Sequence, residues 1–408
     1  MLVFIKVTFV KGCFIMRVLH ISTSDNGGAG RCCLRIHKAL LECGIDSKVV
    51  VKDRFGDNPQ VYSYGAINER IHRIPSKVFR MCGLKITDRN KIMALSTKYN
   101  AYYTLPVSSI DLTKNEWYDW ADIIHLHFVN DYLDYPSFFG KTKKKIVWTL
   151  HDESLFYGVA HWQKDVLVDN KIENRYRCLK EKTIKNVDDL NIVFLSKMMF
   201  DKYKDKSIIR GRNMTIINNS IDGTIFKPYD KFEMRQKYGL EQHKIFLLFI
   251  STDVTIPIKG LELLSRAVTE LNMKDVEILA IGDNPRHKSF PFTKMYGLVN
   301  DENELCELIS TADYFVMPSF QEGFAQSPME AMACGLPVLA FPVSGTDELI
   351  NPGNGIVCKE FNIEALKKGI CQIMSCQYNG DEIRRDLLNR FSSMVIAQKY
   401  IDFYHSLP

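Results

Sequence analysis

The sequence predicts an α/β protein made of two doubly wound parallel-sheet domains, with helices on both faces of each sheet. The chain has 408 residues, which is too long for one ordinary hydrophobic core and suits two domains. Strand-length apolar runs alternate with helix-length segments throughout. Turn-forming residues between 218 and 228 interrupt this alternation, and the pattern restarts beyond them. We therefore expect a first domain over 16–225 and a second over 226–388.

Short apolar runs mark the expected strands. In the first domain they are Val18–Ile21, Ser47–Val51, Ile123–Leu126, Ile146–Leu150 and Ile192–Leu195. In the second domain they are Ile245–Ile250, Glu277–Ile281, Tyr314–Met317 and Val338–Phe341. The segment Asp53–Pro106 follows neither the strand nor the helix period, so we expect an irregular or helical insertion there.

The last twenty residues, 389–408, predict a terminal helix. Ile396, Tyr400, Phe403 and Tyr404 recur at helical spacing, and such an aromatic face must be buried. We expect this helix to pack back on the first domain; packing on its own domain is the alternative.

The composition argues for a cytoplasmic globular protein. The chain is 46% hydrophobic and 25% charged, and no run reaches the roughly 18 apolar residues that span a bilayer. Its eleven cysteines are scattered without metal-ligand spacing, which fits reduced thiols and predicts no metal site. The net charge of +5 is too mild to indicate nucleic acid.

Two features leave membrane contact as an alternative. The cluster of Lys141, Lys143, Lys144 and Lys145 either meets anionic head groups at the inner face of the membrane or is a solvated turn. Residues 1–15 are apolar but contain charged residues and lack a small-residue cleavage site. We expect them to be an extension upstream of a start at Met16; a tail that touches the membrane is the alternative.

The clearest site pattern follows the strand Tyr314–Met317. A loop carries Glu322 and Gly323, and then Ser327 and Pro328 open a short helix. We expect Ser327 to be the N-cap, because serine caps well and proline suits the first helical position.

A helix N-terminus at the carboxyl edge of a parallel sheet favours phosphate. Glu322 can accept hydrogen bonds from sugar hydroxyls, and Gly323 lets backbone approach a ligand. In the simpler alternatives Glu330 bonds back to the Ser327 amide as a capping box, and Glu322 is a solvated loop acid.

The spacing of Glu322 and Glu330, followed by Ala331–Val338, resembles the signature of the retaining glycosyltransferases of family four, the glycosyl transferases group one. The resemblance extends over nearly the whole chain from Met16. Further matching stretches are Arg17–Ile21 with Gly27–Arg31 (first strand and glycine loop), Trp148–Asp152 (central strand and histidine), and Asn219–Asp222 with Phe226 and Pro228 (interdomain stretch, with Ser220 where glycine is usual). It implies the GT-B fold, in which two Rossmann-like domains face each other across a cleft.

On the donor side, the resemblance implies that Glu330 accepts hydrogen bonds from ribose hydroxyls and that Glu322 holds the donor sugar. The backbone of Gly323, Phe324 and Ala325 would lie alongside that sugar.

Around the diphosphate, the resemblance implies that the backbone amide of Met329 faces the phosphates and that Lys259 binds them. Gly27 and Gly28 would let the backbone come close to the diphosphate. His151 would face the donor sugar from the first domain. His151, Lys259 and Glu322 are thus the expected catalytic residues.

One departure concerns phosphate binding. Many members carry an arginine a few residues before the lysine, whereas this chain reads Phe249–Asp253. Either Lys259 and the helix start suffice, or Arg286 or Lys288 supplies the charge. The glycine loop lacks G-x-G-x-x-G spacing, so no dinucleotide cofactor is expected.

The implied reaction transfers a sugar from a UDP- or GDP-type donor to a glycan or lipid-linked glycan, with retention and without a metal, in cell-surface polysaccharide assembly. Base contacts are expected around Tyr296–Val299. The alternatives are a sugar-nucleotide 2-epimerase and a non-catalytic scaffold. The epimerase needs extra acid/base carboxylates and histidines at the cleft, and none is evident in the sequence.

Overall fold

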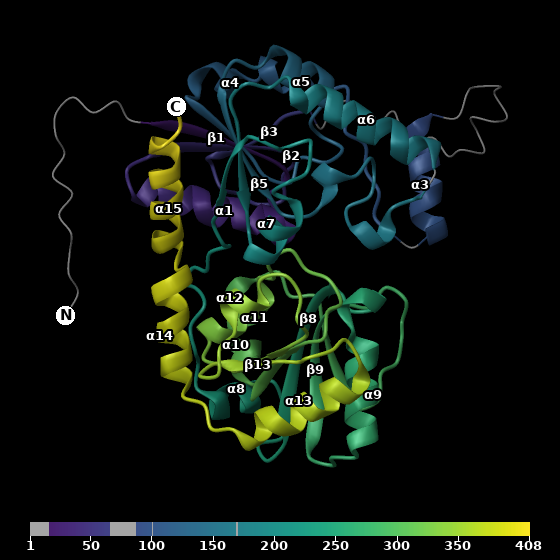
Figure 1. The fold of residues 1–408 in the computed structure, drawn as a ribbon. Coiled ribbons are helices and arrows are strands. Elements are labelled where there is room, and N and C mark those ends of the chain that lie inside the picture. Colours follow the sequence, from purple (N-terminus) through teal and green to yellow (C-terminus); the bar gives the residue numbers. More distant parts are fainter. Residues whose placement is uncertain (1–15, 66–86, 100, 169) are drawn as a thin grey trace.

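The computed structural model describes residues 16–65, 87–99, 101–168 and 170–408. It contains two domains, each with an all-parallel sheet covered by helices (Figure 1). The predicted fold class, two Rossmann-like doubly wound domains, is confirmed.

The first sheet has seven strands in the order β3-β2-β1-β4-β5-β6-β7. These strands are β1 (Arg17–Ser24), β2 (Asp46–Asp53), β3 (Val61–Ser63), β4 (Ile123–Leu126), β5 (Lys145–Leu150), β6 (Leu190–Phe194) and β7 (Asn213–Ile216). Its described helices are α1 (Gly27–Glu42), α3 (Asp88–Tyr99), α4 (Glu116–Trp120), α5 (Tyr135–Lys141), α6 (Lys171–Lys185) and α7 (Lys197–Tyr203).

The second sheet has six strands in the order β10-β9-β8-β11-β12-β13. These strands are β8 (Ile245–Asp253), β9 (Val276–Asp283), β10 (Thr293–Gly297), β11 (Tyr314–Met317), β12 (Val338–Ala340) and β13 (Gly355–Val357). The helices that follow β7 are α8 (Lys231–Lys237), α9 (Leu261–Leu271), α10 (Glu302–Ser310), α11 (Ser327–Ala333), α12 (Thr346–Leu349), α13 (Ile363–Ser375), α14 (Gly380–Phe391) and α15 (Ser393–His405).

All the predicted strands are present. Four further strands, β3, β7, β10 and β13, were not predicted from the sequence. Each of the four is an edge strand. The expected insertion at Asp53–Pro106 contains β3 and α3, so part of it is regular structure. Residues 66–86 and 100 of that segment lie outside the described residues.

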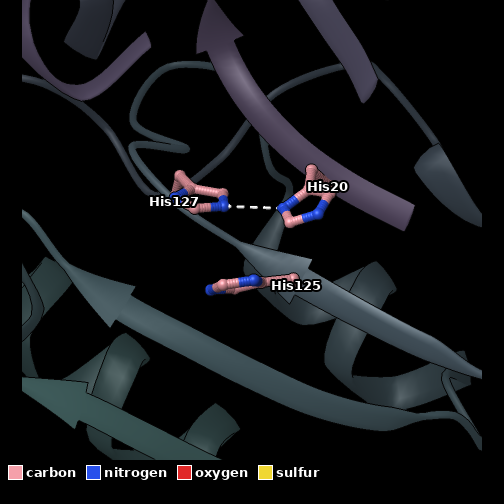
Figure 2. Close-up of side chains that lie close together, drawn as sticks. All are labelled: His20, His125 and His127. Atoms are coloured by element: carbon pink, nitrogen blue, oxygen red, sulfur yellow. Dashed lines mark hydrogen bonds between the residues drawn. The ribbon is translucent and has the colours of Figure 1, made fainter. Parts of the chain in front are cut away.

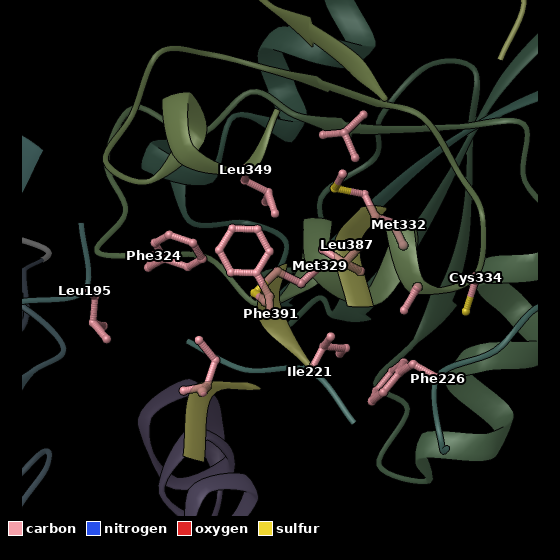
Figure 3. Packing of buried hydrophobic residues seen from close by; sticks show 14 of the residues in the cluster. Leu195, Ile221, Phe226, Phe324, Met329, Met332, Cys334, Leu349, Leu387 and Phe391 are labelled. Atoms are coloured by element: carbon pink, nitrogen blue, oxygen red, sulfur yellow. The ribbon is translucent and has the colours of Figure 1, made fainter. Parts of the chain in front are cut away.

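A hydrophobic cluster runs from one domain into the other (Figure 3). Leu195 and Ile221 contribute from the first domain, and Phe324, Leu387 and Phe391 contribute from the second. The chain crosses between the domains twice. The crossings lie side by side, because Ile221 N donates to Phe391 O at 2.9 Å and Ser393 N donates to Ile221 O at 3.0 Å.

The terminal helix α15 lies against the first domain, beside α1 (Figure 1). Tyr400 OH is 2.9 Å from Thr149 Oγ1, and Tyr404 OH is 2.7 Å from His125 Nδ1. Both tyrosines are buried, so the aromatic face identified in the sequence covers this side of the first sheet.

Three of the four clustered lysines bond within the protein. Lys141 pairs with Asp111, Lys144 donates to two carbonyls, and Lys145 donates to Leu407 O. Among the residues that the structure describes, no helix combines the length and apolar character needed to cross a bilayer.

Candidate active site

A cavity of about 750 Å³ lies between the two domains. It opens at the carboxyl edges of both sheets, where ligands of doubly wound proteins bind. Of the predicted site residues, all but Met329 line it: Gly27, Gly28, His151, Lys259, Glu322, Gly323, Phe324, Ala325 and Glu330. Residues far apart in the sequence therefore meet in one site.

Met329 has a different environment. Its side chain is fully buried in the hydrophobic cluster that joins the domains (Figure 3). Any role of this residue toward a ligand would thus fall to its backbone.

The wall from the second domain carries an ion pair. Lys259 ends a 3₁₀ turn at Pro257–Lys259, and its Nζ lies 2.7 Å from Glu322 Oε1 on the loop after β11. The lysine side chain is 32% exposed and the glutamate side chain 14%. The two groups are therefore accessible from the cavity, and each balances the charge of the other.

The start of α11 differs from the prediction. The helix begins at Ser327 with Gln326 in the N-cap position, and no side chain caps it, so the prediction of Ser327 as the N-cap was wrong by one residue. The capping-box alternative also fails, because the carboxylate of Glu330 and the side chain of Gln326 both bond to Arg35 of the first domain.

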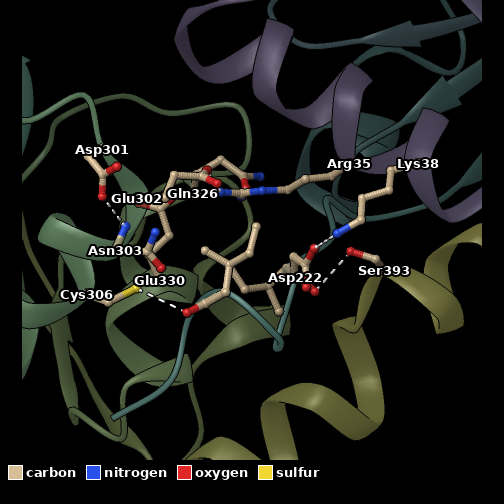
Figure 4. Close-up of polar contacts among 12 residues, drawn as sticks. Arg35, Lys38, Asp222, Asp301, Glu302, Asn303, Cys306, Gln326, Glu330 and Ser393 are labelled. Atoms are coloured by element: carbon tan, nitrogen blue, oxygen red, sulfur yellow. Dashed lines mark hydrogen bonds and ion pairs between the residues drawn. The ribbon is translucent and has the colours of Figure 1, made fainter. Parts of the chain in front are cut away.

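Arg35, which bonds to two residues of the candidate site, was missed by the sequence analysis. Its Nη2 lies 2.9 Å from Glu330 Oε1 and 3.3 Å from Glu302 Oε1, and its Nη1 donates to Gln326 Oε1 (Figure 4). The side chains of Arg35 and Glu330 are only 7% and 5% exposed. A buried ion pair therefore ties α1 of one domain to α11 of the other.

The pKa of Arg35 reflects this pairing. Burial is the largest influence and lowers the pKa, but Glu330, with smaller contributions from Cys32 and Glu302, more than offsets burial and raises the pKa above its ordinary value. Arg35 is thus permanently charged. One signal was present in the sequence: Arg35 falls among the buried positions of α1, between Cys32 and Ala39, where an isolated charge needs a partner.

The wall from the first domain carries His151, directly after β5. A Cβ added at Gly323 would lie 2.5 Å from the carbonyl oxygen of His151, so only glycine lets the loop of the second domain come this close. A Cβ added at Gly28 would meet nothing within 4 Å. Gly28 therefore leaves open space beside the cavity.

An acid–base pair also lines the cavity. Asp152 Oδ2 lies 2.5 Å from His161 Nδ1, and Thr104 Oγ1 lies 2.9 Å from His161 Nε2. The pKa of Asp152 is lowered: burial raises it, but His161 and Ser154 more than offset burial. The structure thus places one carboxylate–histidine pair at the cleft, a grouping that was not evident in the sequence.

The two suggested substitutes for the usual arginine lie elsewhere. Arg286 donates to Thr255 O at 3.3 Å, and Lys288 pairs with Glu262 at 3.3 Å. Neither lines the cavity, whereas Arg31, near the start of α1, does. Arg31 and Lys259 thus bring positive charge from opposite domains.

Only part of the stretch Tyr296–Val299, which was expected to contact the base of the nucleotide, lines the cavity. Leu298 and Val299 line the cavity after β10. Tyr296 instead packs edge-to-face on Tyr238, with ring centroids 5.4 Å apart.

Known proteins resemble this chain both in sequence and in fold. Residues 244–376 match the family model described as Glycosyl transferases group 1. The chain is 22% identical over 210 residues to N-acetyl-alpha-D-glucosaminyl L-malate synthase of Bacillus anthracis, a match that covers 48% of this chain and 54% of that protein. The chain thus spans about half the length of this curated relative.

Solved structures match over almost the whole chain. Sucrose-phosphate synthase from Thermosynechococcus elongatus has a TM-score of 0.66 at 16% identity and covers 96% of this chain and 99% of its own. The Anabaena protein HepE, solved with UDP and glucose, has a TM-score of 0.62 at 17% identity and covers 96% of this chain and 100% of its own. The chain has the GT-B fold and contains a glycosyl transferases group 1 domain.

Proposed function

We propose that the protein is a retaining glycosyltransferase that moves a sugar from a nucleotide-diphosphate donor to a hydroxyl acceptor. One observation carries the proposal: Lys259, Glu322 and Glu330 from one domain and His151 from the other line a single cavity. Its volume is within the range of about 300–1,000 Å³ typical of small-ligand sites.

The Lys259–Glu322 pair suits a donor that carries a diphosphate. A diphosphate entering the cavity competes with Glu322 for the Lys259 ammonium, because it carries the greater negative charge. Once released, Glu322 can accept hydrogen bonds from the hydroxyls of the donor sugar. Lys259 then stabilises the charge that develops on the leaving nucleoside diphosphate.

Glu330 is arranged to hold the nucleotide. Arg35 contacts its Oε1, and no described residue bonds to its Oε2, which is thus available to ribose hydroxyls. Nε2 of Gln326 is buried without a hydrogen-bond partner among the described residues. Because Gln326 lines the cavity, this amide can donate to the nucleotide.

The first domain offers a surface for the acceptor. Phe55 and Tyr102 line the cavity and are 71% and 59% exposed. Asp25 fixes the Phe55 loop by accepting from Phe55 N at 2.8 Å and Gly56 N at 2.9 Å. Exposed aromatic faces held in place suit a sugar ring, which supports a glycan or lipid-linked glycan acceptor.

The chemistry needs no protein nucleophile. The acceptor hydroxyl attacks the anomeric carbon of the donor sugar from the same face that the diphosphate leaves. An oxygen of the departing phosphate takes the proton of the hydroxyl. Closure of the two domains excludes water and so limits hydrolysis of the donor. Lys259 and Arg31 supply the positive charge that a metal ion would otherwise provide.

We propose UDP as the nucleotide of the donor, because HepE, which shares the fold, was solved with UDP and glucose. GDP is the second choice. We further propose that the protein acts in the assembly of cell-surface polysaccharide and is located in the cytoplasm or at the inner face of the membrane.

Incubation with radiolabelled UDP- and GDP-sugars and a panel of glycan acceptors tests this function. Transfer with retained anomeric configuration is expected, both with and without chelator. Lys259→Ala should reduce kcat/KM by about 100-fold or more, while Lys288→Ala, a lysine outside the cavity, should leave it unchanged. An epimerised free donor would instead indicate the epimerase, and absence of both turnover and donor binding would indicate a scaffold.

A further inference from the structure

Three histidines gather in the first sheet next to the cavity (Figure 2). His20 lies in β1, His125 lies in β4, and His127 directly follows β4. Their nearest ring nitrogens lie within 4.8 Å of one another, and the side chains are 0–2% exposed.

Hydrogen bonding, rather than metal binding, accounts for this arrangement. Both nitrogens of His125 are engaged, at 2.8 Å to Thr149 Oγ1 and at 2.7 Å to Tyr404 OH. The group also contains no carboxylate or thiolate to offset the charge of an ion.

His20 and His127 form a chain that ends in the cavity. His20 Nδ1 lies 2.9 Å from His127 Nε2, and His127 Nδ1 lies 3.2 Å from His151 Nε2. His151 lines the cavity, whereas His20 and His127 do not. Two hydrogen bonds therefore connect the interior of the sheet to the proposed donor site.

The three rings must share one tautomer. Burial lowers the pKa of His20 and His127 well below the ordinary value and that of His151 to about 4, so each ring is neutral and has one N–H. Each link joins Nδ1 of one ring to Nε2 of the next and needs one donor and one acceptor. All three protons therefore lie on Nδ1, or all three lie on Nε2.

The structure favours the Nδ1–H arrangement. Nε2 of His20 is buried and has no hydrogen-bond partner among the described residues. With all protons on Nε2, this atom would be an unpaired buried N–H, which is rare in folded proteins. With all protons on Nδ1, it is only an unfilled acceptor, and the chain ends in an N–H of His151.

We propose that His20 and His127 are positioning residues that hold His151 as its Nδ1–H tautomer, so that His151 donates a hydrogen bond into the cavity. This role deepens the proposed function, because an N–H there stabilises an oxygen of an anionic donor. His151 then acts as a fixed donor and not as a general base.

Nitrogen-15 NMR of the full-length protein, labelled only at histidine and free of substrate, tests the proposal. Long-range proton–nitrogen correlations distinguish the protonated nitrogen of each ring, and variants lacking one ring assign the signals. We expect Nδ1–H at His20, His127 and His151. A mixed pattern, an Nε2–H pattern or a charged ring at pH 7.5 overturns the proposal.

A pair of variants tests the coupling at a distance. His20→Phe removes the far end of the chain, so His127 is no longer held and the His151 signals should shift, although His20 does not contact His151. His125→Phe is the matched control: it is equally buried and lies in the adjacent network, and it should leave the His151 tautomer unchanged. Unchanged His151 signals in a folded His20→Phe protein contradict the proposal.

Activity provides a separate measurement. kcat/KM for the donor should fall in His20→Phe and stay near that of the wild type in His125→Phe. Because the tautomers are read without substrate, a protein with the expected tautomers but no transferase activity would contradict only the proposed function. The opposite result would contradict only the role of the histidine chain.

Discussion

Arg35 shows how a single charge links the two domains. It lies 295 positions before its partner Glu330, and both side chains are buried. Removing one member of a buried ion pair leaves the other uncompensated, whereas removing both does not. The same pair holds the carboxylate proposed to bind ribose, so stability and binding depend on it together.

A double-mutant cycle tests this coupling. Arg35→Met and Glu330→Gln should each lower the free energy of unfolding by about 3 kcal/mol, and the double variant should lose clearly less than the sum. Urea unfolding of the four proteins measures the cycle. Additive losses would show that the two side chains are not paired.

At the scale of single elements, burial decided which strands could be predicted. Every predicted strand is an inner strand of its sheet, where both faces are covered and the sequence is mostly apolar. The missed strands are edges: β7 and β10 are largely half-buried and carry polar residues such as Asn213 and Lys294. Their identity depends on a neighbouring strand and not on their own pattern.

The residues of the candidate site also differ in whether the sequence could predict them. Residues carried by local motifs, such as Glu322 and Glu330, could be placed in the cleft from the sequence. Arg35, and the pairing of Asp152 with His161, could not, because each depends on how distant or irregular segments pack. Helix α11 begins at Ser327, one residue earlier than predicted, and Arg35 engages the Glu330 carboxylate that the capping box would have used.

Helix α15 allows a test at this scale. Tyr404→Phe removes the hydroxyl bonded to His125 Nδ1 and leaves a buried nitrogen unpaired. We expect a loss of about 1–3 kcal/mol in the free energy of unfolding. Tyr99→Phe, at a half-exposed tyrosine of α3, is the control and should be neutral. Equal stability of the two variants would mean that the bond to α15 contributes little.

Over the whole molecule, buried neutral histidines make stability depend on pH. Burial lowers the pKa of His37 and of His151 to about 4, and it lowers those of His20, His125 and His127 well below their ordinary value. Below about pH 6.5 the unfolded chain binds protons at these sites and the folded chain does not. Stability is therefore complete above this pH and is lost as the pH falls toward 4.

Urea unfolding between pH 7.5 and 5 measures this loss. Each histidine that stays neutral contributes a slope of up to about 1.4 kcal/mol per pH unit. The His37→Gln variant should reduce the slope by about one histidine. A constant unfolding midpoint over this range would contradict the burial of neutral rings.

The central claim is that the cavity between the domains binds a nucleotide diphosphate through Lys259. Isothermal titration calorimetry with UDP and GDP, on the wild type, Lys259→Ala and Lys288→Ala, tests it most directly. The wild type and Lys288→Ala should bind one of the two nucleotides with equal affinity, and Lys259→Ala should bind it at least about 10-fold more weakly, because a charge-assisted contact is lost. Equal affinity in Lys259→Ala, or no binding to the wild type, would contradict the claim.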